Sequence, residues 1–160
     1  MGGRAVAEPL DMRALVSTGL AYAKTLLSGT GDIVTFGVRV AADGGLGLGV
    51  VGAEEAEGRE GKRATILCVG YHAAALRGEI RAACLLVPSI VTPRGGKRSK
   101  GLMALYEDKD GNSLMTVYAC RKRFLLGWAF DLVEPVKERG NSFGIFDPGS
   151  DLPAVGVVSE

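Results

Sequence analysis

The sequence has little of what metal sites and catalytic sites are usually built from. It contains one histidine, His72, and three cysteines, Cys68, Cys84 and Cys120, which lie far apart and form no C-x-x-C pair. A zinc site would need such closely spaced ligands. We therefore expect three buried, reduced thiols in a cytoplasmic protein, with no metal and no cofactor.

The chain also lacks a charge excess, a long apolar run and many aromatic residues. Its 19 Lys and Arg balance 18 Asp and Glu to a net charge of +1, which argues against a protein whose whole surface binds nucleic acid. The 24 glycines and 47% hydrophobic residues predict a turn-rich globular domain. Because no run of about 18 apolar residues and no signal-peptide core occurs, we expect no membrane span and no membrane partner.

Two stretches have the apolar spacing of helices. In residues 10–28 the apolar side chains recur at helical intervals after Pro9, which suits a first helical turn, and Gly29 can end the helix. A second apolar stripe occupies residues 64–77 and stops before Gly78.

The remaining apolar stretches have strand character. Asp43-Gly44 is a strong hairpin signal, and Pro88 marks a bulge or an edge position. The predicted strands are residues 33–40, 46–51, 79–92, 101–108 and 114–123. Together these elements predict an α+β fold, an antiparallel sheet of about five strands with two helices packed on one face, in the order α-β-β-α-β-β-β. The pattern of residues 124–136 fits a short strand, a helical turn, or both. We expect one domain over residues 1–135 and an extended or partly disordered tail over residues 136–160, in which Phe143 and Phe146 can dock on the domain.

Several short segments resemble a family of small uncharacterised bacterial α+β proteins. They are Thr35-Phe36-Gly37, Asp43-Gly44, Gly78 to Val87, Tyr106 to Gly111, and Val117-Tyr118-Ala119-Cys120. In that family a helix runs into a PFG-like strand and an acid-glycine turn, and an antiparallel meander follows. The resemblance implies an α+β fold for residues 10 to 125, and it implies no activity and no site residue.

Two motifs match ligand sites only in part. Gly47 to Gly52 reads G-x-G-x-x-G, but it follows a hairpin signal and runs into four glutamates that would repel phosphate, so we interpret it as a glycine-rich strand. Asp108 to Asn112 begins like a calcium loop, but Ser113 stands at the sixth position and Ala119 at the twelfth, so we interpret it as a β-turn.

Cys68 and His72 lie four residues apart and therefore on one side of the second predicted helix. In a Cys–His pair the histidine can activate the thiol as a nucleophile, provided that the pair lies in a cleft and a third group orients the histidine. The alternative is a structural histidine in an alanine-rich helix. The sequence shows no third group, and we expect no catalytic residue.

The loop "PRGGKRSKG" (residues 93–101) is the most informative segment, because a second cationic cluster ends a later strand of the same sheet. The cations are Arg94, Lys97, Arg98 and Lys100 in the loop and Arg121, Lys122 and Arg123 in the strand. Antiparallel strands return the chain to one end of the sheet, so both clusters should meet there. They predict a phosphate-binding patch. The alternative is a solvated loop that protects a sheet edge from aggregation.

Two functions follow as hypotheses. The first is a non-catalytic protein that acts through protein–protein contact as a homodimer, because the long apolar strand near residues 80–91 needs cover and two-fold dimers are common. The second is a nucleic-acid or anion-binding domain that uses the cationic patch. An enzyme with an unrecognised pocket is a third possibility.

Overall fold

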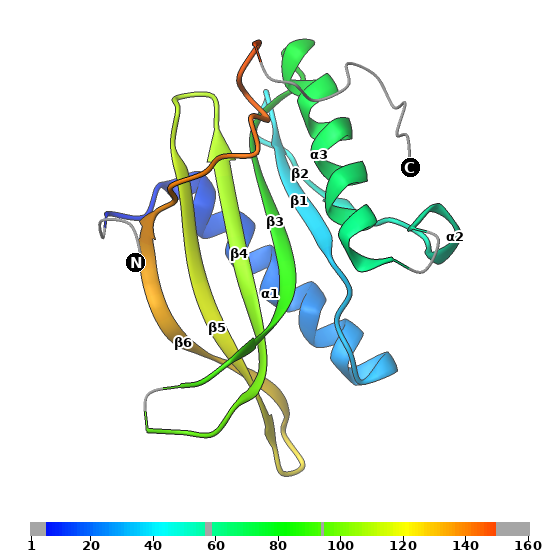
Figure 1. Cartoon of the computed structure of the whole chain (residues 1–160), viewed down its shortest axis with the longest axis vertical. Coiled ribbons are helices and arrows are strands. Elements are labelled where there is room, and N and C mark those ends of the chain that lie inside the picture. Colours follow the sequence, from blue (N-terminus) through cyan, green and yellow to red (C-terminus); the bar gives the residue numbers. More distant parts are fainter. Residues whose placement is uncertain (1–5, 57–58, 94, 150–160) are drawn as a thin grey trace.

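The structure is a computed structural model that describes residues 6–56, 59–93 and 95–149 (Figure 1). Its elements are α1 (Leu10–Thr30), β1 (Phe36–Ala41), β2 (Leu46–Gly49), α2 (Ala53–Ala56), α3 (Glu60–Leu76), β3 (Ile80–Val91), β4 (Ser99–Asp108), β5 (Ser113–Arg123) and β6 (Gly127–Glu138). The strands form one antiparallel sheet in the order β2-β1-β3-β4-β5-β6. This architecture confirms the predicted α+β class and, with the short helix α2 and a sixth strand added, the predicted order of elements.

Glycines stand where the chain leaves its elements. The sequence predicted the turns at Gly44 and Gly111, but α1 runs past Gly29, its predicted end, to Thr30. Gly31 follows α1 in the left-handed conformation with φ 80°, and its N–H donates a hydrogen bond to the carbonyl of Leu27. Gly44 and Gly111 have φ values of 98° and 92° in the β1–β2 and β4–β5 turns. A side chain at these φ values would be strained, so the three glycines fix where the chain reverses.

The two long helices cover opposite faces of the sheet, and the prediction that both pack on one face is wrong. Ala82, Cys84 and Leu86 of β3 join the core under α1, whereas Ala83 and Leu85 join the core under α3. All five residues are buried. A strand whose consecutive side chains are all apolar needs cover on both faces, which a helix on one face cannot provide. Figure 1 shows α1 behind the sheet and α3 in front of it.

Of the alternatives that the sequence left open for residues 124–136, the structure shows a strand, β6, which is longer than the short strand considered. β6 pairs with β5 from Gly127 to Glu138, so the domain boundary predicted at residue 135 lies within a strand. The chain then crosses the sheet towards α3 (Figure 1), where Phe143, Ile145 and Phe146 pack in the core beneath that helix. Residues 150–160 of the predicted tail lie outside the described residues. No helix in the described part of the chain is long and apolar enough to span a membrane.

Candidate functional site

Both cationic clusters lie at one end of the sheet. The β4–β5 ladder closes at the pair Gly101 and Ala119. Residues 97–100 come just before this pair and residues 121–123 come just after it, so they leave the ladder at the same end. Figure 1 shows this end at the bottom, with the β3–β4 loop and the β5–β6 turn. We call it the cationic end. Arg94 lies outside the described residues.

Two of the predicted cations are engaged by the protein itself. Lys100 donates a hydrogen bond of 2.6 Å to the carbonyl oxygen of Gly31 and lies 3.5 Å from the carboxylate of Asp32. It therefore neutralises the negative end of the α1 dipole. Arg121 donates two hydrogen bonds of 2.7 and 3.2 Å to the carboxylate of Asp131 on β6, and this contact lowers the pKa of Asp131. Neither cation is free to bind a ligand without first losing a partner.

Four cations have no carboxylate partner within the described ranges: Lys97, Arg98, Lys122 and Arg123. Lys97 and Arg98 are exposed in the β3–β4 loop. The ammonium of Lys122 lies 5.9 Å from the ring centre of Trp128, and Arg123 donates a hydrogen bond to the carbonyl oxygen of Leu126. Exposed cations without a counter-charge attract anions at short range.

The cationic end also carries an apolar tip. Phe124, Leu125 and Leu126 form the β5–β6 turn and are 87%, 86% and 67% exposed. They follow directly after Arg121, Lys122 and Arg123. The sequence contains this signal, "RKRFLL", but the turn is recognisable only once β6 is known to be a strand.

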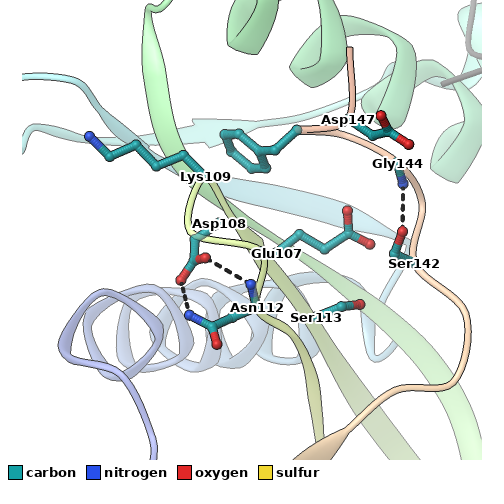
Figure 2. Close-up of a pocket in the computed structure, with 10 residues that line it drawn as sticks. Glu107, Asp108, Lys109, Asn112, Ser113, Ser142, Gly144 and Asp147 are labelled. Atoms are coloured by element: carbon teal, nitrogen blue, oxygen red, sulfur yellow. Dashed lines mark hydrogen bonds between the residues drawn. The ribbon is translucent and has the colours of Figure 1, made fainter. Parts of the chain in front are cut away.

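A second region, around Glu107, was not singled out from the sequence. A pocket of about 140 Å³ lies between the β4–β5 turn and residues 142–147 (Figure 2). The buried carboxylate of Glu107 accepts hydrogen bonds from Arg139 Nη1 and the Ile145 N–H, each at 3.2 Å, and from the Phe143 N–H. These contacts attach the C-terminal segment to the sheet, and they leave Glu107 occupied.

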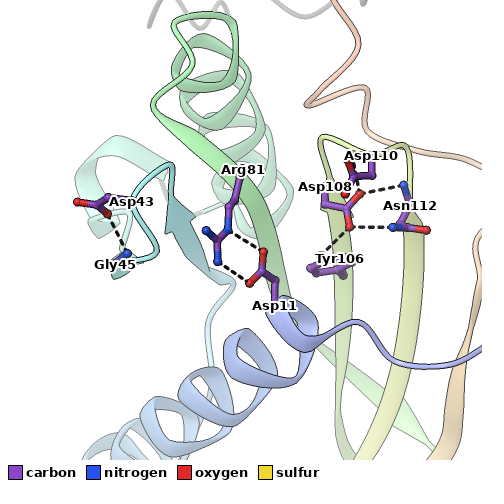
Figure 3. A network of polar contacts seen from close by, with 8 residues as sticks. All are labelled: Asp11, Asp43, Gly45, Arg81, Tyr106, Asp108, Asp110 and Asn112. Atoms are coloured by element: carbon purple, nitrogen blue, oxygen red, sulfur yellow. Dashed lines mark hydrogen bonds and ion pairs between the residues drawn. The ribbon is translucent and has the colours of Figure 1, made fainter.

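The neighbouring Asp108 organises the β4–β5 turn. Its carboxylate accepts hydrogen bonds from the Tyr106 hydroxyl at 2.8 Å, from the Asn112 amide at 2.8 Å and from the backbone N–H of Asp110 at 3.0 Å (Figure 3). The segment from Asp108 to Asn112 is thus a β-turn, as the sequence predicted, and its leading carboxylate serves the turn. Figure 3 also shows Arg81 of β3 bound through two hydrogen bonds to Asp11 of α1.

Cys68 and His72 are buried beside the same C-terminal segment. The Nδ1 of His72 lies 2.9 Å from the carbonyl oxygen of Ile145, to which its N–H donates. Burial, with a smaller contribution from the negative charge of Glu107, raises the pKa of Cys68 to about 12. A thiol with this pKa stays protonated near neutral pH and is a poor nucleophile. The described residues contain no group of three or more His, Cys, Asp and Glu side chains placed to hold a metal.

The G-x-G-x-x-G motif lies on the edge strand β2. A Cβ atom on Gly47 would come within 2.4 Å of the Arg39 guanidinium, and one on Gly49 within 2.5 Å of the Tyr71 hydroxyl. Packing against these two side chains therefore explains both glycines. The only helix that begins at the motif is α2, which has four residues, including Glu54 and Glu55.

Compared with known proteins, the chain matches no protein-family model, no curated protein and no solved structure. The resemblance to small bacterial α+β proteins therefore stays a prediction from the sequence.

Proposed function

We propose that this chain is a binding protein whose cationic end contacts phosphate groups on a larger partner. The observation that carries the proposal is the group of four exposed cations at one end of the sheet, none of which has a carboxylate partner in the described part of the chain. Phosphate contacts of this kind depend on charge and reach rather than on a shaped pocket. The other candidate region, around Glu107, has its carboxylates satisfied by the protein's own donors.

Random duplex DNA is a suitable probe, because it presents phosphates at high density. Four phosphate contacts at roughly −0.9 each predict a log–log slope of affinity against salt of about −3.6. Changing Lys97 and Lys122 to alanine should reduce the slope by about 1.8. The control changes Lys109, an exposed lysine in the β4–β5 turn at the opposite end of the sheet, to alanine and should leave the slope unchanged. Absence of binding at low salt would refute the proposal.

A second candidate function, assembly into a homodimer, is favoured by the exposed edge of the sheet at β2. Leu46 and Leu48 pair with Val40 and Val38 of β1, whose side chains are buried in the core under α1. The two leucines continue that apolar face beyond the helix and are exposed. An apolar edge strand of this kind can pair with the same strand of a second copy about a two-fold axis.

Light scattering at high micromolar concentration tests the dimer. We expect the mass of two chains for the unchanged protein and the mass of one chain after Leu48→Lys. Leu132→Lys provides the control, because Leu132 is an exposed leucine on the opposite edge strand, β6. A monomer mass for the unchanged protein would contradict the dimer.

A further inference from the structure

We propose that the phosphate groups bound by the cationic end belong to the surface of an anionic lipid bilayer, and that Phe124, Leu125 and Leu126 insert between the lipid headgroups. This inference rests on the proposed phosphate-binding function and names its partner. It departs from the expectation of no membrane partner. That expectation was based on the absence of a spanning segment, and a turn that enters the headgroup region needs none.

The first observation is the position of the apolar tip. The three residues form the turn between the paired residues Arg123 and Gly127, and the Leu126 N–H donates a hydrogen bond of 3.1 Å to the Arg123 carbonyl oxygen. In Figure 1 this turn is the lowest point of the molecule. A projecting apolar turn can enter a soft, flat surface such as a bilayer. A rigid protein partner would need a matching cavity.

The second observation is the positive charge at the same end of the sheet as the tip. Arg123 borders the turn, Lys122 lies one residue further back, and Lys97 and Arg98 lie in the β3–β4 loop at the same end of the sheet. The two carboxylates described at this end, Asp32 and Asp131, are paired with Lys100 and Arg121 and not with these four cations. Cations at this depth would meet lipid phosphates while the apolar side chains reach the acyl boundary. Nucleic-acid phosphates would use the cations but leave the apolar tip in water.

The third observation is Trp128, which lies on β6 just behind the tip. Trp128 lies directly opposite Lys122 in the β5–β6 ladder, and its ring is only half-buried. Tryptophan and phenylalanine beside lysine and arginine are the residues that favour the interface between water and lipid. The indole therefore lies level with Lys122 and one residue pair behind Arg123 and Gly127, close to the apolar tip and beside the cations.

The fourth observation is the backbone at Leu125. Its φ is 61°, and it is the only non-glycine residue with a positive φ in the described part of the chain. Leu125 is the third of the four residues, Arg123 to Leu126, that the hydrogen bond from Leu126 to Arg123 closes into a turn. Glycine or asparagine usually occurs at this position when its φ is positive. A leucine there is strained, and its exposed side chain has little packing inside the protein to offset the strain. Strain of this kind points to a function for the side chain outside folding.

Co-sedimentation with vesicles tests the inference. We expect binding to vesicles of equal phosphatidylcholine and phosphatidylglycerol, and little binding to phosphatidylcholine alone. Burying one large apolar side chain changes a partition coefficient about tenfold or more, so Phe124→Ser with Leu126→Ser should weaken binding about a hundredfold. The control changes Leu10 and Leu132, two exposed leucines elsewhere, to serine and should leave binding unchanged.

Two further measurements, on a variant of Lys97 and Lys122 and on the fluorescence of Trp128, test the inference independently. Each cation near an anionic surface contributes about fivefold in affinity, so Lys97→Ala with Lys122→Ala should weaken vesicle binding about 25-fold. Trp128 is the only tryptophan in the chain and lies two residues from the tip. Lipids with brominated acyl chains should quench its fluorescence in the unchanged protein and not in the tip variant. Thermal unfolding of each variant establishes that it is folded.

The outcomes separate this inference from the proposed function. Binding to duplex DNA without binding to anionic vesicles would overturn the lipid inference and leave phosphate binding intact. Binding to neither probe would overturn both. Vesicle binding that survives the serine changes at the tip would show attraction by charge alone and would overturn insertion.

Discussion

The hydroxyl of Tyr71 lies over Gly49, where a Cβ atom would come within 2.5 Å of it. Gly37 faces Gly49 across the β1–β2 ladder, and a Cβ atom there would come within 2.4 Å of the same hydroxyl. The tyrosine ring thus fills the space that two side chains would occupy. Its hydroxyl is buried and has no hydrogen-bond partner within the described residues.

This packing predicts a coupling between Gly49 and Tyr71. Gly49→Ala should lower the free energy of unfolding by about 1–3 kcal/mol, because it forces atoms into filled space. Tyr71→Phe should raise it by about 1 kcal/mol, because it removes a buried hydroxyl without a partner. In the double variant the atom nearest to the new Cβ atom at residue 49 is Leu67 Cδ2, at 3.1 Å. Gly49→Ala should therefore lower the free energy of unfolding less in the Tyr71→Phe background than in the unchanged protein. Urea unfolding measures all three variants.

Gly37→Ala is the control for the comparison of Gly49→Ala, Tyr71→Phe and the double variant. Its Cβ atom would still lie 2.8 Å from ring atom Cε2 of Tyr71 after the hydroxyl is removed. Tyr71→Phe should therefore rescue Gly49→Ala and leave most of the penalty of Gly37→Ala. Additive effects at Gly49 and Tyr71 would contradict the packing described above.

The sequence predicted the elements better than their arrangement. Apolar spacing and turn glycines are local signals, so α1, α3 and the strands from β1 to β5 were located to within a few residues. The face that a helix covers is set by the sheet as a whole. The apolar run in β3 contained the necessary signal, because residues 82–86 are all buried, and such a run requires cover on both faces.

For the candidate site, chain connectivity was enough to bring the two cationic clusters to one end. It could not reveal which cations have partners. Asp32, next to Lys100, comes from the end of α1, and Asp131, next to Arg121, comes from β6. The contact of Lys100 depends on how the helix packs, and that of Arg121 depends on β6, which the sequence left undecided between a strand and a helical turn. The apolar tip was missed for the second reason, since a turn is defined by the strands on both sides of it.

The ion pair between Glu107 and Arg139 should be important for stability. Both side chains are nearly buried, 5% and 12% exposed, with their nearest charged atoms 3.2 Å apart. Glu107→Ala would leave a buried guanidinium and two backbone N–H groups, those of Phe143 and Ile145, without their acceptor. Loss of one member of a buried pair typically costs about 3–5 kcal/mol. Urea unfolding should show a loss of this size.

An exposed ion pair on the same sheet is the comparison for Glu107. Asp131→Ala removes the partner of Arg121, and both of these side chains are about half exposed. The expected loss is much smaller than that of Glu107→Ala, because water screens both charges of this pair. Limited proteolysis should cut residues 139–149 faster in Glu107→Ala than in Asp131→Ala, because Glu107 holds that segment. Equal cleavage rates would argue against this role.

The buried thiols should make the fold sensitive to alkaline pH. Burial raises the pKa of Cys68 and Cys84 to about 12 and that of Cys120 to about 11, from an ordinary value of 9.0. Above pH 9.0 the unfolded chain releases protons that the folded chain retains. The free energy of unfolding should therefore fall as the pH rises, by up to about 1.4 kcal/mol per pH unit for each thiol. Urea unfolding between pH 8 and pH 10 measures this slope.

Cysteine variants identify the source of the alkaline slope. Cys68→Ala or Cys84→Ala should make it shallower than in the unchanged protein, whatever either change does to stability at neutral pH. Measurements below about pH 10 limit the contribution of tyrosine, whose ordinary pKa is about 10. An unchanged slope in both variants would show that the thiols are not the groups responsible.

The strained turn at Leu125 gives the last prediction. Leu125→Asn should raise the free energy of unfolding by about 0.5–1 kcal/mol, because asparagine tolerates a positive φ better than leucine. Little packing is lost, since the leucine is exposed. Leu126→Asn is the control and should give no such gain, because Leu126 has no positive φ. The same Leu125→Asn protein should bind anionic vesicles about tenfold less tightly, because it lacks one inserting side chain. A variant that is more stable and binds as before would separate the strain at this turn from lipid binding.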